Sequence, residues 1–269
     1  MSYLVVKVGG RALLSNMDAI LRDLARHTSS SKIILVHGGG DVVTAYSKRL
    51  GIEPRIVLHP SGMKSRYTSR EELEVYVMVM AGKLNKEIVS KLVALRVKAI
   101  GLSGADAGIL KARRKERIII INERGRRQVI EGGYTGSIYM VAADMIEKLL
   151  EIVDVLVIAP IAVSDKGELL NVDGDQAALK IAEAIKPEAL ILLSDVPGVI
   201  LDGRVIDDID ADAVEDLVDK IGPGMNRKIL AASRAVKSGV GRVVISSGLI
   251  EEPITGALKG GGTVIHGQG

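Results

Sequence analysis

Short aliphatic runs alternate along this chain with segments of helical periodicity, and this alternation constrains the fold more than any other feature. The first two runs, YLVVKVG and KIILVHGGG, are each followed by an amphipathic stretch. VDVLVIAPI, EALILLSDV and GRVVIS continue the pattern in the second half. Continuous apolar strands that alternate with helices are typical of a mostly parallel sheet covered on both faces. The pattern therefore predicts an α/β fold.

The 269 residues suffice for one large domain or two lobes. In the middle of the chain, RIIIIN and RRQVIEGG are β-rich runs divided by polar turns, which predicts hairpins. No segment has the composition of a linker. A soft boundary near residues 172–175 predicts an N-terminal lobe, 1–172, and a C-terminal lobe, 173–269, within one continuous fold.

Composition argues against several classes of protein. The absence of cysteine excludes disulfides and thiol nucleophiles, and the four scattered histidines have no metal-ligand spacing, so we expect no metal held by protein side chains. Phe and Trp are absent, so base stacking lacks its usual aromatics and we expect no nucleic acid partner.

No apolar run approaches the roughly 20 residues that cross a bilayer, and no signal-peptide pattern opens the chain. We therefore expect a cytoplasmic protein without a membrane partner. Abundant Lys, Arg and Glu beside few Asn and Gln hint at a heat-adapted source.

Glycines follow two of the predicted strands: Gly9 and Gly10 after the first, and Gly38, Gly39 and Gly40 after the second. Each cluster then enters a helix. Backbone N–H groups without side chains can approach an anion, and a helix N-terminus favours negative charge. Two such loops at one edge of a sheet predict a phosphate site. The chain lacks a P-loop motif and has no convincing dinucleotide motif after its first strand.

Charged residues near these loops allow two readings. Considered without its neighbours, Lys7 would be a strand-end lysine that extends to water. Because it lies beside the first glycine loop, it can also reach an anion that this loop holds. Lys228, in GPGMNRK, raises the same question. Considered without the other motifs, it would be an ordinary surface lysine at the start of a helix. The segment from Asn171 to Asp175 precedes a helix, and Asp173 or a neighbour should cap it. Three polar groups in this segment exceed what a cap requires.

Taken together, these pieces resemble the amino acid kinase family, and within it the N-acetylglutamate kinase branch, over nearly the whole chain. The matching motifs, in the family's order, are KVGG, HGGG, SRYT, NVDGD, LLSDVPG and GMNRK. The resemblance implies a three-layer α/β/α sandwich around a mostly parallel central sheet, the carbamate kinase-like fold. It implies an N-terminal lobe for acceptor binding and dimerisation, a C-terminal lobe for ATP, and phosphoryl transfer from ATP to a carboxylate.

The resemblance also implies roles for single residues. Lys7 and Lys228 would neutralise the transferring phosphoryl group, and Asp175 would orient them. Gly10 and Gly39 complete the implied catalytic set. Acceptor binding is implied for Gly38, Gly39, Arg66 and Asn171. ATP binding is implied for Lys7, Gly9, Gly10, Ser194, Asp195, Gly203 and Lys228, with backbone N–H groups donated by Gly9, Gly10, Gly38 and Gly39. Mg²⁺ would be held largely by the phosphates. An acceptor carboxylate, with a pKa near 4, is already ionised and needs no general base.

Two segments depart from the N-acetylglutamate pattern. HPSGMKSRYTSREE places Lys64 and Tyr67 around Arg66, and EGGYTGS contains Tyr134. They look like the kinases of the carrier-protein route to lysine, in which a small acidic carrier of the LysW type caps the α-amino group of 2-aminoadipate or glutamate. The leading interpretation is a kinase of carrier-bound 2-aminoadipate in lysine biosynthesis. Carrier-bound glutamate, and with it arginine biosynthesis, stays open.

A basic run fits that interpretation. The segment from Lys98 to Arg127 contains nine basic residues and three acidic ones, which gives a local net charge of +6. Such a run is either a solvated hairpin face or a docking surface for an acidic partner. The candidates for carrier docking are Lys64, Lys111, Arg113, Arg114, Lys115 and Arg117.

Three alternatives remain at this stage. The first is N-acetylglutamate kinase of arginine biosynthesis, and the second is uridylate kinase, for which no second nucleotide pattern is present. The third is a non-catalytic, amino-acid-sensing module, which the presence of Lys7, Lys228 and Asp175 argues against. The resemblance further implies a homodimer, for which the helical pattern of residues 71–95 offers an interface.

Overall fold

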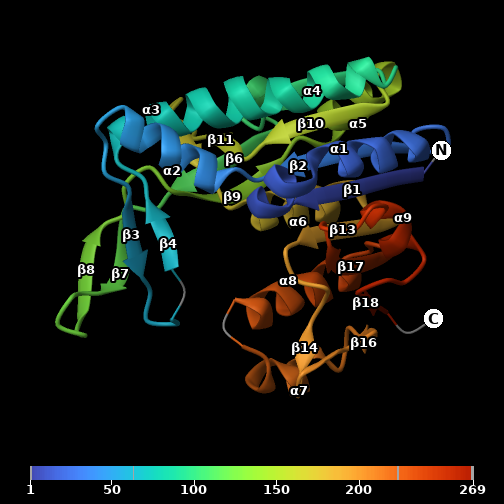
Figure 1. Ribbon diagram of the computed structural model, residues 1–269. Coiled ribbons are helices and arrows are strands. Elements are labelled where there is room, and N and C mark those ends of the chain that lie inside the picture. The colour runs from blue at the N-terminus through green and yellow to red at the C-terminus, as the bar shows by residue number, and fades with distance from the viewer. Residues whose placement is uncertain (1, 63, 223, 268–269) are drawn as a thin grey trace.

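A computed structural model describes residues 2–62, 64–222 and 224–267 of the chain. One central sheet runs through it in the order β16-β18-β17-β13-β1-β2-β10-β5 (Figure 1). Every neighbouring pair is parallel except β17 with β18. Its strands are β1 (Ser2–Val8), β2 (Ser31–His37), β5 (Ala99–Ser103), β10 (Val155–Ala159), β13 (Ala189–Ser194), β16 (Asp208–Asp210), β17 (Arg242–Ser247) and β18 (Thr263–His266).

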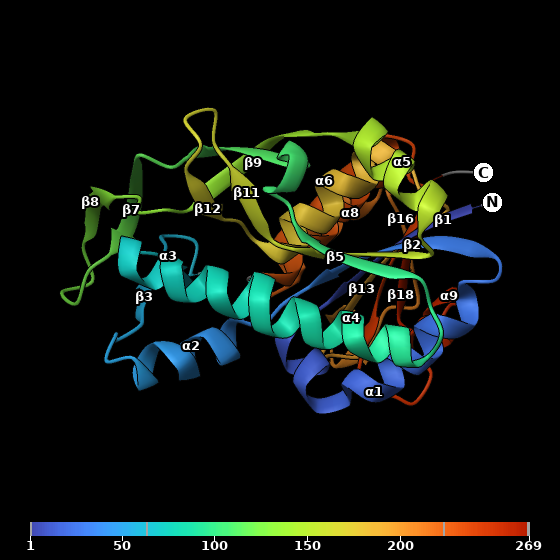
Figure 2. The same ribbon diagram turned by 90° about the horizontal axis from the view of Figure 1, so that it is seen from above.

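Helices cover both faces of this sheet, as Figure 2 shows. One face packs against α1 (Gly10–His27), α4 (Asn85–Ala94) and α9 (Pro253–Leu258), and the other against α5 (Ala143–Ile152), α6 (Gly174–Ile185) and α8 (Met225–Lys237). Side chains of β1 alternate between the two cores: Val5 joins one, and Leu4 and Val6 join the other. The predicted α/β/α sandwich with a mostly parallel sheet is confirmed.

The helical pattern of residues 71–95 forms one long rod in three parts. α3 (Arg70–Val77) passes into a π-helical turn, η1 (Met78–Leu84), and then into α4. α2 (Gly40–Arg49) packs beside α3 and η1. π-helical turns inside α-helices are rare and gather at functional sites.

Two small sheets extend from the N-terminal half. One has the order β4-β3-β7-β8 and contains the predicted hairpin RIIIIN–RRQVIEGG. Its strands are β3 (Arg55–Leu58), β4 (Lys64–Tyr67), β7 (Arg117–Ile121) and β8 (Arg127–Glu131). The other comprises β12 (Leu169–Asn171), β11 (Ile161–Val163), β6 (Leu110–Arg114) and β9 (Gly136–Val141).

The C-terminal half adds the hairpin β14 (Ile200–Leu201) to β15 (Arg204–Val205) and the short helix α7 (Val214–Leu217). Short 3-10 turns cover Asp106–Gly108 and Val218–Lys220. β1 and β13, which belong to the two predicted lobes, pair directly, so one sheet spans both. Within the described ranges, no helix combines the length and apolarity that a membrane span needs.

Candidate functional site

The two glycine loops follow β1 and β2, which are neighbours in the sheet, and β13 ends on the other side of β1. The N–H of Gly9 donates to Leu193 O at 2.8 Å, and the N–H of Gly38 donates to Val8 O at 2.8 Å. Both loops therefore continue the parallel pairing for one more residue. The carboxyl ends of β1, β2 and β13 meet at one edge, where ligands of open α/β sheets bind.

Beyond these bonds, the backbones of the two loops touch. A Cβ on Gly10 would lie 2.9 Å from Gly39 N, and one on Gly38 would lie 2.6 Å from Gly10 N. Only residues without side chains allow this approach. Gly10 begins α1 and Gly39 caps α2, and the N–H groups of both meet no acceptor among the described residues.

These bonds correct one expectation from the sequence. Gly9 and Gly38 were expected to donate their N–H groups to the ligand, but those groups are committed to the carbonyls of Leu193 and Val8. A sheet-edge N–H that already donates at 2.8 Å has no proton left for phosphate. Phosphate binding through N–H groups stays a prediction for Gly10 and Gly39.

One carboxylate joins two lysines at this edge. Asp175 Oδ1 lies 2.7 Å from Lys7 Nζ, and Asp175 Oδ2 lies 3.2 Å from Lys228 Nζ. β1 supplies Lys7, the first turn of α8 supplies Lys228, and the first turn of α6 supplies Asp175. α6 starts there because Asp173, its N-cap as predicted, accepts from the N–H of Gln176 at 2.9 Å.

The surroundings of Lys7 and Asp175 favour the charged forms of both side chains. Burial disfavours the charged form of Lys7, but the charge and hydrogen bond of Asp175, together with the charges of Asp173 and Asp195, raise the lysine's pKa. Burial likewise opposes ionisation of Asp175, but the charges of Lys7 and Lys228 lower its pKa below the ordinary value. Two lysines thus surround one carboxylate at this edge of the sheet.

A pocket of about 220 Å³ opens beside this triad. Six of the seven residues expected at ATP line it, together with Arg11 and Ala12: Lys7, Gly9, Gly10, Ser194, Asp195 and Lys228. Gly203 lies outside the lining. It forms the tip of the β14–β15 hairpin with Asp202, and both residues have positive φ, 50° and 77°. An Asp-Gly turn of this kind explains the glycine without a ligand.

The sequence did not point to Arg11. Its Nη1 lies 3.0 Å from Asp195 Oδ2, and its Nε lies 3.7 Å from Asp41 Oδ2. It therefore links the first glycine loop to the second loop and to the end of β13. Its place directly after Gly10 was the only available signal.

Arg66, expected at the acceptor, lies near the second loop. Its guanidinium donates to Glu72, to Thr44 and, at 2.9 Å, to Gly40 O. Glu72 is buried, and the sequence analysis missed it. The signal was the capping box SREE, in which the Glu72 N–H donates to the N-cap Ser69 at 3.2 Å.

The two segments that depart from the N-acetylglutamate pattern meet in space, together with Asn171. The N–H of Tyr134 donates to Thr68 O at 2.8 Å. Asn171 donates its side-chain amide to Thr68 Oγ1 at 2.9 Å and its backbone N–H to Tyr134 O at 2.9 Å. Segments about 66 and 103 residues apart thus form one wall beside β4.

The expected docking cations divide between the two small sheets. Lys64, Lys115 and Arg117 are exposed and form no ion pair with a described residue. Lys111 lies 3.7 Å from Asp165, and the guanidinium of Arg113 lies 5.0 Å from the ring centre of Tyr139.

Arg114 is the exception among these cations. Its guanidinium pairs with Glu131 at 2.9 Å and Glu168 at 3.1 Å, and it lies 4.0 Å from the Tyr134 ring centre. Its charge is therefore already matched inside the protein, and its part in docking stays a prediction.

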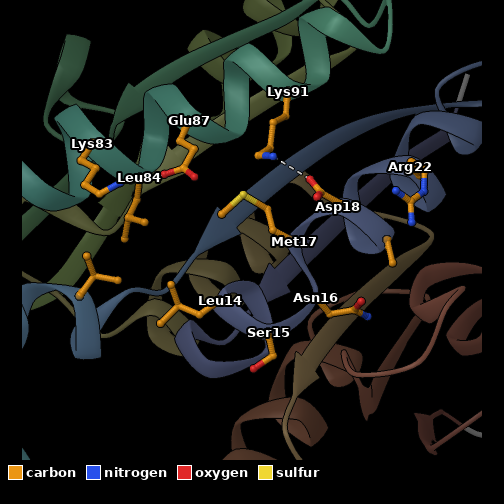
Figure 3. Close-up of a pocket in the computed structure, with 12 residues that line it drawn as sticks. Leu14, Ser15, Asn16, Met17, Asp18, Arg22, Lys83, Leu84, Glu87 and Lys91 are labelled. Atoms are coloured by element: carbon orange, nitrogen blue, oxygen red, sulfur yellow. Dashed lines mark hydrogen bonds and ion pairs between the residues drawn. The ribbon is translucent and has the colours of Figure 1, made fainter.

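A second pocket, of about 590 Å³, lies between α1, η1 and α4 (Figure 3). Ion pairs span or border it: Lys91 with Asp18 at 2.8 Å, and Lys83 with Glu87 at 3.0 Å. None of the residues predicted from the sequence to form the site lines it. Its size alone therefore does not make it the candidate site.

Comparison with known proteins gives consistent results. The model of the amino acid kinase family matches residues 2–247. A LysW-aminoadipate/LysW-glutamate kinase of Saccharolobus islandicus is 49% identical over 263 residues, which cover 97% of this chain and 98% of the relative. The protein of the same name from Metallosphaera sedula is 48% identical, with coverages of 97% and 99%.

Solved structures show the same fold. Carbamate kinase from Giardia lamblia bound to AMP-PNP aligns with a TM-score of 0.68 and 15% identity, covering 99% of both chains. N-acetylglutamate synthase from Neisseria gonorrhoeae, with coenzyme A and N-acetyl-glutamate, aligns with a TM-score of 0.81 and 22% identity, over 100% of this chain and 60% of that one.

Proposed function

Because the chain belongs to the amino acid kinase family, we propose that it transfers the γ-phosphoryl group of ATP to the side-chain carboxylate of carrier-bound 2-aminoadipate. Carrier-bound glutamate is the second acceptor that we propose. The names of relatives that are 48–49% identical over nearly the full length support both acceptors. The products are an acyl phosphate and ADP. We propose that the reaction serves lysine biosynthesis and, through glutamate, arginine biosynthesis.

The triad of Lys7, Asp175 and Lys228 is the observation that carries this proposal. An oxygen of the acceptor carboxylate attacks the γ-phosphorus and forms the new O–P bond. The bond to the β–γ bridging oxygen breaks, and its electron pair leaves with ADP. No proton moves, so the protein's task is to bring anions together and stabilise the charge that shifts.

Each group has a matching part in that task. The ammonium groups of Lys7 and Lys228 offset the charge on the phosphoryl oxygens, and Asp175 holds both cations in place. The N–H groups of Gly10 and Gly39, at two helix N-termini on the same edge, would donate to phosphate oxygens. Arg66 and Asn171 hold the α-side polar groups of the acceptor.

We propose Mg²⁺ as the companion of ATP. Ser194 and Asp195 line the pocket with oxygen atoms, the ligand type that Mg²⁺ takes, but Asp195 already pairs with Arg11 at 3.0 Å. Phosphate oxygens would therefore supply most of its ligands. When bound, Mg²⁺ offsets negative charge on the β- and γ-phosphates.

A phosphotransfer assay tests the acceptor. The purified protein is given ATP and Mg²⁺ with carrier-bound 2-aminoadipate, carrier-bound glutamate or free N-acetylglutamate, and hydroxylamine traps the acyl phosphate. We expect turnover of the carrier-bound acceptors alone. Robust turnover of free N-acetylglutamate would overturn the proposal in favour of N-acetylglutamate kinase.

Lys228→Ala separates catalysis from mere binding. We expect it to abolish transfer while ATP binding, followed by calorimetry, stays measurable but weaker. Full activity of this variant would contradict the mechanism. Lys259→Ala, an exposed lysine after α9, is the matched control and should behave as the unaltered protein.

We further propose a homodimer that forms through the long helical rod of the N-terminal half. Met78 and Val93, both 56% exposed, and Leu95, 39% exposed, offer it an apolar contact. Light scattering should give twice the 28.6 kDa of one chain. We place the enzyme in the cytoplasm, where ATP and biosynthetic intermediates are made, and in a heat-adapted source, which a melting curve tests.

A further inference from the structure

One face of the four-stranded sheet β4-β3-β7-β8 exposes apolar side chains. Ile56 is 54% exposed, Ile119 49% and Val129 58%. Ile119 and Val129 are directly opposite each other on β7 and β8. Ile121, two residues along β7, is opposite Leu58 of β3, so Ile56 lies on the same face.

The opposite face of the same sheet is different. Val57 and Ile120, the residues that alternate with this set, are 4% and 6% exposed. The sheet therefore buries one face and leaves Ile56, Ile119 and Val129 uncovered on the other. We call these three residues the apolar centre. Exposed apolar groups on adjacent strands are a liability in a free protein and mark a surface that a partner covers.

Cations surround the apolar centre. The register places Lys64 opposite Leu58, Arg127 opposite Ile121, and Arg117 two residues from Ile119, all on the exposed face. We call these three the basic rim. Each is exposed, and none forms an ion pair with any residue in the described ranges. Glu131, opposite Arg117, is already taken by Arg114 at 2.9 Å.

This face leads to the acceptor end of the site. Arg66 is opposite Ile56 on β4, and its guanidinium reaches back to Gly40 O, next to the second glycine loop. A partner that covers the apolar centre thus lies beside the residue expected to hold the acceptor. A tether from that partner would have a short path to the phosphoryl group.

From these contacts we propose that the apolar centre and basic rim form the docking surface for the body of the acidic carrier protein. The inference rests on the proposed function and deepens it, since Ile56, Ile119 and Val129 were not among the docking candidates expected from the sequence. Apolar contact supplies affinity at the centre, and complementary charge at the rim supplies orientation and a fast encounter.

Charge decides between this occupant and a second copy of the chain. A symmetric contact of this face with itself would bring two basic rims together. Like charges across an interface cost free energy, whereas an acidic partner gains from every rim residue. Nucleic acid would also meet the cations, but the apolar centre has no aromatic ring on which a base can stack.

Two variants test the surface: Ile119→Thr, which keeps a β-branched side chain, and Arg117→Glu. Matched controls are Ile152→Thr, an apolar residue 65% exposed at the end of α5, and Lys259→Glu, an exposed cation after α9. KM and kcat are measured with the full carrier bearing 2-aminoadipate. They are measured again with a short peptide that bears 2-aminoadipate through the same linkage.

We expect both surface variants to raise KM for the full carrier about 10-fold, the effect of losing one interface hot spot, with kcat unchanged. KM for the short peptide should not change, and the controls should match the unaltered protein. Equal KM values for surface and control variants with the full carrier would overturn the docking surface. An equal rise with carrier and short peptide would also overturn it, because the effect would then lie at the active site.

A direct measurement of carrier binding tests the docking surface independently of the proposed function. Calorimetry with the unphosphorylated carrier measures docking even if no acceptor is turned over, a result that would sink the proposed function alone. We expect weaker binding by both surface variants. Unchanged carrier affinity, together with a lower oligomeric state of Ile119→Thr in light scattering, would reassign the face to contact between copies. Melting curves confirm that each variant is folded.

Discussion

Lys7 Nζ lies 2.7 Å from Asp175 Oδ1, a contact that ties the first strand of the chain to the first turn of α6. The same carboxylate holds Lys228. Because two ammonium groups repel each other, their common position depends on the anion between them.

Asp175→Asn should therefore lower kcat. The amide keeps the shape of the carboxylate but not its charge, so the two lysines lose their alignment to the phosphoryl group. We expect a loss of about 100-fold, the lower end for removal of one electrostatic group at an active site. Asp173→Asn, two residues earlier at the helix N-cap, is the control, since asparagine also caps helices well. Equal rates for the two variants would contradict the orienting role of Asp175.

The same carboxylate predicts a pH dependence of stability. The lysine charges outweigh burial and lower the folded-state pKa of Asp175 from 3.8 to about 2. A lowered carboxyl pKa contributes stability above the unfolded value, and that contribution is lost as pH falls through the folded value. The urea midpoint of the unaltered protein should exceed that of Asp175→Asn at pH 6. The difference should shrink between pH 4 and pH 2, and a difference that grew in this range would refute the assignment.

Gly39 predicts a packing effect at the second loop. A Cβ there would lie 2.2 Å from Leu84 Cδ1 and 2.8 Å from Met80 Sδ, and both side chains are buried. Gly39→Ala should push the loop away from Gly10 and lower kcat about 10-fold, because small displacements of positioning groups are costly. Gly40→Ala is the control, because a Cβ on Gly40 would meet no other atom within 4 Å.

The double variant Gly39→Ala/Leu84→Ala then tests the cause. Removing the Leu84 side chain makes room for the new methyl group, so it should restore part of the rate lost in Gly39→Ala. Such a gain is a coupling between contacting residues. If Leu84→Ala only added its own loss, the clash with Leu84 would not explain the effect of Gly39→Ala.

The sequence predicted those parts of the molecule that local pattern controls. Aliphatic runs, glycine clusters and the cap at Asp173 each act within a few neighbouring residues, so the sheet and the loops followed from them. The close placement of Lys7, Asp175 and Lys228 was not visible in pattern and came from the family resemblance. The observed distances bring the three side chains together, and their catalytic roles stay a prediction.

What the sequence could not show depends on pairing between distant segments. Arg11 and Asp195 are 184 residues apart, and nothing local to either predicts their ion pair. Arg114 stood among other cations in a basic run, and only the fold brings Glu168 to it, 54 residues later. The amides of Gly9 and Gly38 were likewise assigned to phosphate because the sheet partners that use them were unknown.

Arg66 and Glu72 give the last prediction. Glu72 is only 2% exposed, and the two side chains form an ion pair in which burial of Glu72 raises its pKa more than Arg66 lowers it. Arg66 depends on this carboxylate, on Thr44 and on Gly40 O for its position. Glu72→Gln removes the charge and should let the guanidinium move from the acceptor end of the site.

We expect Glu72→Gln to raise KM for the acceptor about 5-fold while kcat and KM for ATP change little, since an effect on acceptor binding alone appears in one KM. Glu74→Gln, exposed on the same helix, is the matched control and should leave all three constants unchanged. Thr44→Val removes the hydroxyl acceptor of Arg66 and should raise the same KM without touching the buried carboxylate. A change in KM for ATP instead, or none in either variant, would place Arg66 outside the acceptor site.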